Sequence, residues 1–577
     1  MNYIWNYLKK YPKLLTLDVF GSLFFVLVNL GLPTILSIMI DKAIIPGNQR
    51  LLYILAIVML VVIIAGAAGR ALLSYASSKL TNIMIRDMRN DIFDYTQKFS
   101  HEEFEKIGVP SLVTRVTNDA FVLMQFAEMA LRLGVNTPLM FLGSIVMIII
   151  TSPSLAWIVA AAMPFLLIAI YVIAKKSRPL SEAQQSSLDK INQYARENLT
   201  GLRVIRSFAR EDYQQERFNK ESQHYTSIAT KLFSLMATAN PIFMHILIWM
   251  IVLIMGLALR PLEVGELQIG NLVAFIEYSF HALFSVMMFS QLFIMYPRMN
   301  VSANRLQEIM NTEISIDMNE DGITTTETHG YLKFDNVTFA YPGETENPVL
   351  HNINFEAKPG EMIAFIGSTG SGKSTLVQLI PRFFDVTLGR IIIDGHDVRD
   401  YNLKALRTKI GFIPQKALLF TGTIGDNLRY GKYNASEKEL ERATDVAQAS
   451  DFIHKTKERY HAFLAEGGTN LSGGQKQRLS IARAIVKEPD IYIFDDSFSA
   501  LDYKTDAQLR RRLKEITTKS TVLVVAQRVS SIMNADKIIV LNEGEMVGQG
   551  THEELMENNE IYRDIANSQM KNPTMAE

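Results

Sequence analysis

Residues 367–375 read Gly367-Ser368-Thr369-Gly370-Ser371-Gly372-Lys373-Ser374-Thr375 and match G-x-x-x-x-G-K-[ST] at every fixed position. An apolar, strand-like run from Met362 to Ile366 precedes this stretch, and a helix-like run from Leu376 to Ile380 follows it. In this context the glycines let backbone N–H groups surround phosphate oxygens. Lys373 is then expected to contact the β and γ phosphates, and the Ser374 hydroxyl to ligate Mg²⁺. The stretch therefore predicts an α/β P-loop domain that binds ATP with Mg²⁺.

Two carboxylates follow another buried strand. The run from Ile491 to Phe494 is apolar throughout, as in a central parallel strand, and it is followed by Asp495 and Asp496. Asp495 is expected at the C-terminal edge of the sheet, where it would help to hold Mg²⁺ beside the phosphates. A charged helix then leads to a second apolar strand, 521–526, which ends at Gln527. The right-handed crossover rule places that strand in the same sheet and Gln527 at the same edge.

Between these elements lies Leu471-Ser472-Gly473-Gly474-Gln475, which resembles the signature motif of ATP-binding cassette (ABC) proteins. The resemblance extends to Tyr341 as the aromatic residue that stacks on adenine, Gln415 as the Q-loop glutamine, Ser499-Ala500-Leu501-Asp502 as the D-loop, and Glu466 as part of the x-loop of exporters. It implies that Ser374, Gln415 and Asp495 surround the Mg²⁺. It also implies that two cassettes dimerise head to tail, with each ATP between the Walker motifs of one and the signature of the other.

Two positions depart from the active pattern of that family. Asp496 stands where the catalytic glutamate is expected, and Gln527 stands where the switch histidine is expected. A general base typically contributes about 10² to 10⁴ in rate, so this site is expected to bind ATP and hydrolyse it slowly. The pattern resembles the degenerate-site subunit of bacterial heterodimeric multidrug exporters of the LmrCD type. The implied partner is a second half-transporter that carries the intact glutamate and histidine.

The N-terminal half of the chain predicts a membrane domain. For 577 residues, a hydrophobic content of 48% is high for a soluble protein that contains an ATPase. Six apolar spans of about 20 residues can be read, near 15–40, 51–75, 130–151, 154–175, 237–259 and 270–296. We therefore expect an all-α six-helix transmembrane domain at 1–310, a linker at 311–328 and the ABC cassette at 329–577.

Basic residues predict the orientation of the spans. Lysines precede the first span, and the long segments 76–129 and 176–236 are rich in arginine and lysine, whereas the other loops are short and carry few positive charges. Both termini and the cassette are therefore expected in the cytoplasm of a bacterial cell, with the chain in the plasma membrane. The long segments resemble the intracellular extensions of ABC exporters. Stretches 108–119 and 197–208 match the family's coupling helices, although a solvated helical hairpin is the alternative.

Ionisable groups within the spans are the clues to cargo, because charges at mid-bilayer usually face a partner helix or a wet cavity. They are Asp18, Arg70, Arg132, His245, Glu277 and His281. Glu277 and His281 lie one helical turn apart, and one hypothesis is that Glu277 attracts cationic drugs in a cavity lined by aromatic residues such as Phe280. The alternative is a polar pair that only satisfies buried polarity. Cysteine is absent, and a net charge of −1 gives no electrostatic reason to expect nucleic acid as a partner.

Three functional readings remain open. The favoured reading is an ATP-driven exporter of amphipathic compounds, with the lipid bilayer, small-molecule cargo and a second subunit as partners. A lipid or peptide exporter would have the same fold. A largely inactive regulatory subunit or an ATP-gated channel would explain the substitutions at Asp496 and Gln527.

Overall fold

The computed structural model describes residues 2–344 and 346–570. Residue 1 of the predicted domain 1–310 and residues 345 and 571–577 of the predicted domain 329–577 lie outside the described residues. The described chain divides into two compact units. The first comprises residues 2–97 and 110–312, and the second comprises residues 98–109 and 313–570. The segment 98–109 therefore belongs with the C-terminal unit, although the membrane spans surround it in the sequence.

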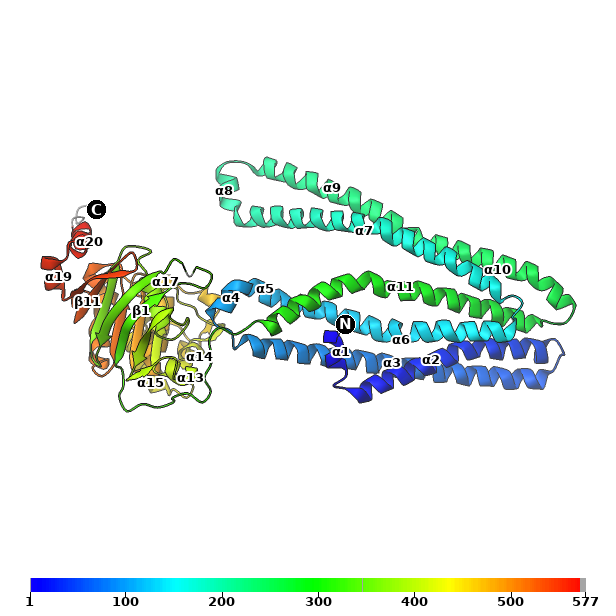
Figure 1. The fold of residues 1–577 in the computed structure, drawn as a ribbon, viewed down its shortest axis with the longest axis horizontal. Helices are drawn as coiled ribbons and strands as arrows, with labels where there is room; N and C mark the ends of the chain where they lie inside the picture. The colour runs from blue at the N-terminus through cyan, green and yellow to red at the C-terminus, as the bar shows by residue number, and fades with distance from the viewer. Residues whose placement is uncertain (1, 345, 571–577) are drawn as a thin grey trace. The chain divides into compact units, whose positions relative to one another are not determined.

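Long helices make up the first unit (Figure 1). In chain order they are α1 (Asn2–Leu8), α2 (Pro12–Met39), η1 (Ile40–Ile44), α3 (Gln49–Thr96), α5 (Val109–Thr114), η2 (Arg115–Asp119), α6 (Ala120–Thr151), α7 (Ala156–Thr200), α8 (Leu202–Ser207), α9 (Glu211–Ala237), α10 (Ala239–Glu263) and α11 (Ile269–Asn311). Among the described residues, six continuous helical segments are long and apolar enough to cross a membrane, which confirms the predicted number of spans.

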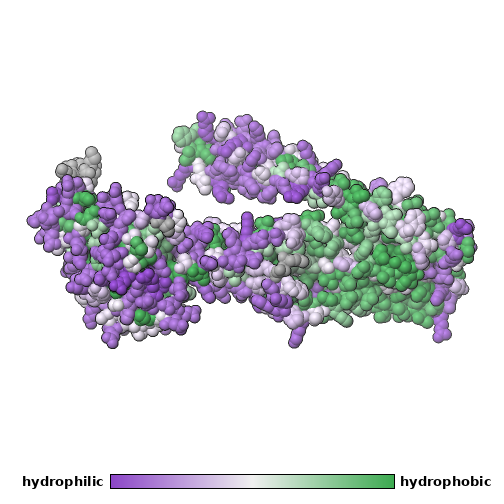
Figure 2. Space-filling model, viewed as in Figure 1, coloured by the Kyte–Doolittle hydropathy of each residue, from purple (hydrophilic) through white to green (hydrophobic). Residues whose placement is uncertain are grey.

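These helices extend beyond the thickness of a bilayer. Helix α3 has 48 residues, and the rise of an α-helix gives it a length of about 70 Å, more than twice the ~30 Å of hydrocarbon. Figure 2 shows the consequence within the first unit: an apolar surface covers the membrane part, and the hairpin end near α8 is mostly hydrophilic. The predicted polar extensions are therefore present.

The hairpin formed by α7 and α9 is packed more loosely than the rest of the unit. Helices α2, α6, α7, α10 and α11 share one apolar core. Toward α8, however, α7 and α9 run together as a separate hairpin (Figure 1). None of the residues of α8 is buried, and Leu199 and Phe208 beside it are 80% and 73% exposed. This end of the hairpin therefore presents apolar side chains to its surroundings.

Three sheets, of four, six and two strands, and the surrounding helices make up the second unit. Its strands are β1 (Leu332–Phe339), β2 (Leu350–Ala357), β3 (Met362–Gly367), β4 (Leu388–Ile393), β5 (His396–Asp397), β6 (Ile410–Ile413), β7 (Gly422–Thr423), β8 (Phe463–Leu464), β9 (Ile491–Asp495), β10 (Thr521–Val525), β11 (Lys537–Asn542) and β12 (Glu545–Gly550). Its α-helices are α4 (His101–Ile107), α12 (Lys373–Leu379), α13 (Leu403–Thr408), α14 (Ile424–Arg429), α15 (Glu437–Val446), α16 (Ser450–Lys455), α17 (Gly473–Lys487), α18 (Tyr503–Ile516), α19 (His552–Asn558) and α20 (Glu560–Met570).

The larger sheet brings the predicted site strands together. Its order is β12-β11-β3-β10-β9-β6, and β10 pairs in parallel with both β3 and β9. Every residue of β9 and β10 is buried, which explains why both sequences are apolar at each position. Val525 lies opposite Asp495, so the two strands end at the same edge. The prediction that Gln527 follows a strand of this sheet is confirmed.

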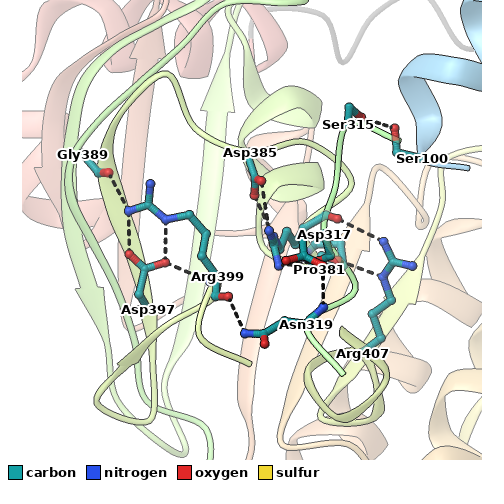
Figure 3. Close-up of polar contacts among 11 residues, drawn as sticks. Ser100, Ser315, Asp317, Asn319, Pro381, Asp385, Gly389, Asp397, Arg399 and Arg407 are labelled. Carbon is teal, nitrogen blue, oxygen red and sulfur yellow. Dashed lines mark hydrogen bonds and ion pairs between the residues drawn. The ribbon is translucent and has the colours of Figure 1, made fainter. Parts of the chain in front are cut away.

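Segment 313–328, expected as part of a linker, is attached to the second unit. Ile316 is buried in its core. Figure 3 shows that the Asp317 carbonyl accepts a hydrogen bond from Arg382 and that Asn319 Nδ2 donates to the Arg399 carbonyl at 3.2 Å. The hydroxyls of Ser100 and Ser315 are 2.7 Å apart, which joins the start of α4 to the same segment.

The stretch 108–119, expected to match a coupling helix, is helical from Val109 and comprises α5 and η2. Residues 110–119 lie in the first unit, whereas α4, just before them, belongs to the second unit. Docking of 108–119 on a cassette stays a prediction. Helix α4 begins with a capping box in which Ser100 and Glu103 exchange hydrogen bonds, and it ends at Gly108 with φ 81°. Gly108 therefore separates α4 from α5, which begins at Val109.

Candidate functional site

The P-loop connects β3 to α12 as predicted. Gly372 precedes the helix with φ 90°, a conformation that favours glycine, and a Cβ there would lie 2.6 Å from Leu350 Cδ2. Lys373 Nζ donates to the carbonyls of Gly367 at 3.1 Å and Ser368 at 2.6 Å, and to Ser371 Oγ at 3.2 Å. All three acceptors are neutral, so the ammonium group retains its charge for an anionic ligand.

A hydroxyl and a carboxylate meet at the edge of the sheet. Ser374 Oγ donates to Asp495 Oδ1 at 2.8 Å. Burial raises the pKa of Asp495, and the hydrogen bond from Ser374 acts in the opposite direction. Burial likewise lowers the pKa of Lys373, while the charges of Asp496 and Asp495 oppose that change. Two adjacent oxygen ligands beside a buried lysine fit Mg²⁺ bound to a phosphate.

The Asp496 carboxylate is held by two carboxamides. Its Oδ2 accepts hydrogen bonds from Gln527 Nε2 at 2.8 Å and Gln415 Nε2 at 3.0 Å. The Asp496 backbone has φ 47°, which non-glycine residues adopt infrequently, and its N–H donates to the Val525 carbonyl at 3.0 Å. Strand β10 therefore fixes the backbone of Asp496, and Gln527, just after β10, and Gln415, just after β6, hold its side chain.

Tyr341 lies near the P-loop helix. Its hydroxyl is 3.0 Å from Thr375 Oγ1, and its ring meets Phe384 edge to face with a centroid distance of 5.4 Å. Phe384 in turn meets His101 of α4 edge to face at 5.6 Å. Two ring contacts thus join α4 to the residue expected to stack on adenine.

The signature residues begin helix α17. Ser472 N donates to Gln475 Oε1 at 2.9 Å, and Gln475 N donates to Ser472 Oγ at 3.4 Å, which forms a capping box. Ser472 and Gly473 are exposed, and a Cβ on Gly473 would meet no atom within 4 Å. Leu471 is half-buried. The signature is therefore preformed and accessible in this chain.

The predicted D-loop lies beside both the signature and Asp496. A Cβ on Gly474 would lie 3.2 Å from the Ala500 carbonyl. Ser499 Oγ donates to the Asp496 carbonyl at 2.9 Å. Leu501 is buried, and Asp502 caps α18 by accepting from Thr505 N at 3.0 Å. The D-loop backbone thus connects the two motifs.

Comparison with known proteins identifies the family. The family model described as the ABC transporter transmembrane region matches residues 15–287, and the one described as ABC transporter matches residues 350–499. An uncharacterized ABC transporter ATP-binding protein of Mycobacterium tuberculosis is 36% identical over 584 residues, which covers 99% of this chain and 98% of that protein. The chain belongs to the ABC transporter family.

Further relatives of this ABC transporter carry different functional names. A putative multidrug export ATP-binding/permease protein of Bacillus subtilis is 30% identical over 97% of each chain. An ATP-dependent lipid A-core flippase of Syntrophus aciditrophicus is also 30% identical, over 96% of this chain and 91% of that protein. A solved structure of a bacterial Atm1-family ABC exporter with ATP bound has a TM-score of 0.80 at 24% identity, over 97% and 99% of the two chains. The fold is therefore that of an ABC exporter, and the chain is an ATPase coupled to transport.

The three residues proposed to contact the cargo of this ABC transporter do not share one environment. His281 and Phe280 line a cavity, together with Phe284. Glu277 is exposed and is not among the residues that line it. Of the other aromatic residues on the same helix, Tyr278 is 1% exposed and donates its hydroxyl hydrogen bond toward the Leu30 carbonyl. Phe280 and His281 therefore form a wall from which Glu277 is absent.

Sequence reasoning missed several contacts that form only on folding. One is the ring contact of His101 with Phe384, for which the Ser100 and Glu103 capping pattern was a usable signal. Another is the convergence of Arg70 and Arg132 on the cavity that His281 lines. The sequence identified both arginines as ionisable groups within spans, but no local pattern joins residues from different helices.

One cluster in the cassette resembles a metal site by composition alone. His329, Asp394 and Asp490 place one ligand atom each within 4.8 Å of one another. Lys409 Nζ donates to Asp394 Oδ2 at 2.9 Å and to Asp490 Oδ2 at 3.1 Å. The lysine supplies the positive charge between these carboxylates, so the cluster is an ion-pair network of the cassette.

Proposed function

We propose that this chain is one subunit of a heterodimeric ATP-driven exporter, and that its own Walker motifs belong to a slowly hydrolysing ATP site. The observation that carries the proposal is the Asp496 carboxylate, which accepts hydrogen bonds from both Gln415 and Gln527. A general base must point a free carboxylate lone pair at the attacking water. In Asp496 the two glutamines occupy Oδ2, so only Oδ1 is left to accept from the water, and the side chain is one methylene shorter than glutamate.

The rest of this site favours binding of Mg²⁺ and ATP. Lys373 and the P-loop amides would hold the phosphates, Tyr341 would contact the base, and Ser374 with Asp495 and Gln415 would surround the metal ion. Bound Mg²⁺ supplies charge neutralisation of the phosphates. The residues of this chain orient the nucleotide, whereas Asp496 and Gln527 leave proton removal from water inefficient. Tight binding with slow hydrolysis is the expected behaviour.

The signature supports the second half of the proposal. Residues Leu471, Ser472, Gly473, Gly474 and Gln475 are intact and preformed, and they would complete the ATP site whose Walker motifs come from the partner. That partner would carry the catalytic glutamate and the switch histidine. Basic residues on the polar extensions favour a cytoplasmic cassette and cytoplasmic termini in a bacterial plasma membrane.

The cargo is proposed to be an amphipathic, drug-like compound. The name of the Bacillus subtilis relative favours a drug, and that of the Syntrophus aciditrophicus relative favours a lipid, so lipid export is the second candidate. Both readings require an apolar cargo that enters from the membrane or the cytoplasm. Neither requires Glu277.

The test uses the full-length chain in lipid nanodiscs, alone and after co-purification with its partner. We expect the chain alone to bind radiolabelled ATP with little hydrolysis, and Asp496→Asn to leave the rate unchanged. Lys373→Ala is the control and should abolish binding. Full ATPase activity of the chain alone that Asp496→Asn abolished would overturn the degenerate site. A complex that hydrolysed ATP but moved neither dye nor lipid in vesicles would indicate a regulatory subunit or ATP-gated channel.

A further inference from the structure

A cavity lies among four helices of the first unit. It has a volume of about 370 Å³, which is near the lower end of the range for small-molecule sites. Helices α2, α3, α6 and α11 contribute its lining residues, which are Phe25, Asn29, Arg70, Leu73, Ser74, Arg132, Leu133, Asn136, Thr137, Met140, Phe280, His281, Phe284, Ser285 and Met288. The cavity thus draws on every one of the four helices for at least one polar group.

The charge of the lining has one sign. Arg70 and Arg132 are both present, and none of the lining residues is aspartate or glutamate. Within the described residues, neither arginine forms an ion pair with a carboxylate; the Arg70 guanidinium instead lies over the Phe25 ring at 5.0 Å. The acidic residues one helical turn away, Glu128 before Arg132 and Glu277 before His281, lie outside the lining. The two positive charges therefore have no carboxylate partner among the described residues of this chain.

Both arginines lie in membrane helices, where an uncompensated charge is unfavourable. Arg70 is within the apolar part of α3, and Arg132 is within that of α6. Ionisable side chains at such positions usually pair with one another or line a functional cavity, and two cations cannot pair. An anionic ligand between them would neutralise both, and guanidinium groups bind carboxylate and phosphate oxygens with paired hydrogen bonds.

A further polar group in the cavity is unsatisfied. Asn136 Oδ1 is buried and has no hydrogen-bond partner among the described residues. The oxygen and nitrogen of an asparagine amide exchange places by a half rotation of the side chain, so Asn136 can instead direct its N–H groups at an anion. It lies one helical turn from Arg132 on α6, which places the amide and the guanidinium on the same side of the helix.

Other lining residues of the cavity are apolar. The rings of Phe280 and Phe284 are stacked, with centroids 5.5 Å apart and planes at 15°. Met140 and Met288 complete this surface with flexible side chains that adapt to varied shapes. The cavity therefore offers both cationic and apolar groups to a ligand.

We propose that this cavity binds anionic amphipathic compounds, with Arg70 and Arg132 contacting a phosphate or carboxylate head group and Phe280, Phe284 and the methionines contacting an apolar body. The proposal rests on the proposed exporter function and deepens it by naming the charge class of the cargo. It replaces attraction of cations by Glu277 with selection of anions by two arginines. The head group can belong to a membrane lipid or to a free amphiphile.

The test measures binding of radiolabelled dodecyl phosphate to the full-length chain in a non-ionic detergent. The double variant R70Q/R132Q should weaken binding by at least tenfold, and R70K/R132K should retain part of the affinity. Lys79→Gln combined with Lys176→Gln removes two exposed charges elsewhere on the helices and should change binding less than twofold. Dodecyltrimethylammonium, which has the same chain and a cationic head, should bind the wild type and R70Q/R132Q with similar affinity.

Competition by lipid distinguishes the two sources of the anion. Displacement of dodecyl phosphate by phosphatidic acid and not by phosphatidylcholine would assign the site to a lipid, whereas no displacement by either would assign it to a free amphiphile. Equal binding of dodecyl phosphate by wild type and R70Q/R132Q would overturn the proposal. ATP binding is measured in the same samples to separate the proposed exporter function from the anion selectivity of the cavity. R70Q/R132Q should bind ATP like the wild type whether or not the cavity selects anions.

Discussion

Replacing Asp496 with glutamate and Gln527 with histidine is expected to increase ATP hydrolysis more than either change alone. Asp496 Oδ2 accepts two hydrogen bonds, at 2.8 and 3.0 Å, from the carboxamides of Gln527 and Gln415. Glutamate alone adds the reach of one methylene, about 1.5 Å. Its carboxylate would still hydrogen-bond with Gln415 and Gln527, so part of the added length would not bring it closer to the attacking water.

The expected increase in ATP turnover depends on two opposing free energies, the contribution of a general base and the strength of the competing hydrogen bonds. A working general base contributes about 10² to 10⁴ in rate, or about 3 to 5.5 kcal/mol. A hydrogen bond to a charged group is worth about 1.5 to 3 kcal/mol, and the exposed Gln415 and Gln527 favour the lower end. Asp496→Glu alone should therefore raise turnover by about tenfold or less. Adding Gln527→His replaces one competing carboxamide donor with an imidazole and should raise the total to about 10²-fold.

The assay is a double-mutant cycle on steady-state ATP hydrolysis by the full-length chain and by its complex. The intact signature allows two copies of this chain to complete the site, so the chain can be measured by itself at high concentration. A coupling free energy near 1.5 kcal/mol is expected between positions 496 and 527. Strictly additive effects, or an unchanged rate in the double variant, would refute the reasoning and direct attention to the signature supplied by the partner. Lys373→Ala in each background measures contaminating activity.

Three other predictions concern separate contacts. Burial raises the pKa of Asp495, so its carboxyl is protonated more readily in the folded chain. As the pH is lowered, ATP affinity in the presence of Mg²⁺ should therefore begin to fall at a pH above 3.8, the ordinary pKa of aspartate. In a binding titration, Asp495→Asn should remove this loss of affinity in acid. The same shift means that the contribution of Asp495 to folding stability is present at low pH and is lost as the pH rises through its raised pKa. Ser472→Ala should lower the free energy of unfolding by about 1 kcal/mol, measured by thermal unfolding, and should reduce ATP turnover by the complex. The control Ser436→Ala removes the matching cap of α15, so it should cost similar stability and leave turnover unchanged. His101→Ala should remove an aromatic contact worth about 0.5 to 1.5 kcal/mol and weaken the stimulation of ATPase activity by cargo. His101→Phe retains a ring and should preserve the stimulation. Equal stimulation in both variants would show that the ring contact does not contribute to coupling.

The sequence predicted best what local chemistry determines. The P-loop follows from a short motif, and the edge that Asp495 shares with Gln527 follows from one topological rule for parallel strands. The sequence analysis did not identify α4, although the Ser100 and Glu103 capping pattern gave a usable signal for a helix before Gly108. The position of Glu277 shows a different limit. Helical spacing placed it beside His281, but packing against three other helices decides which side of α11 faces the cavity.

The same limit explains why the arginine cavity was not predicted. Arg70 and Arg132 are 62 positions apart in the sequence, and each has an ordinary apolar neighbourhood along its own helix. Their significance arises only where α3 and α6 meet and no carboxylate faces them. A single charged side chain in a membrane helix is unfavourable by itself, whereas two like charges that line the same cavity indicate a site for a ligand of opposite charge.

The polar cluster at Asp496 bears on how the cassettes would move. With two copies of this chain, both ATP sites would contain Asp496 and Gln527 and both would hydrolyse slowly. With a partner that supplies the glutamate and histidine, only the site completed by the Leu471 to Gln475 signature would turn over rapidly. ATP would then persist at the Asp496 site and keep that edge of the dimer closed while the other edge opened. A complex that binds two ATP molecules should therefore release one phosphate promptly, and Asp496→Glu with Gln527→His should make the release of the second phosphate nearly as fast.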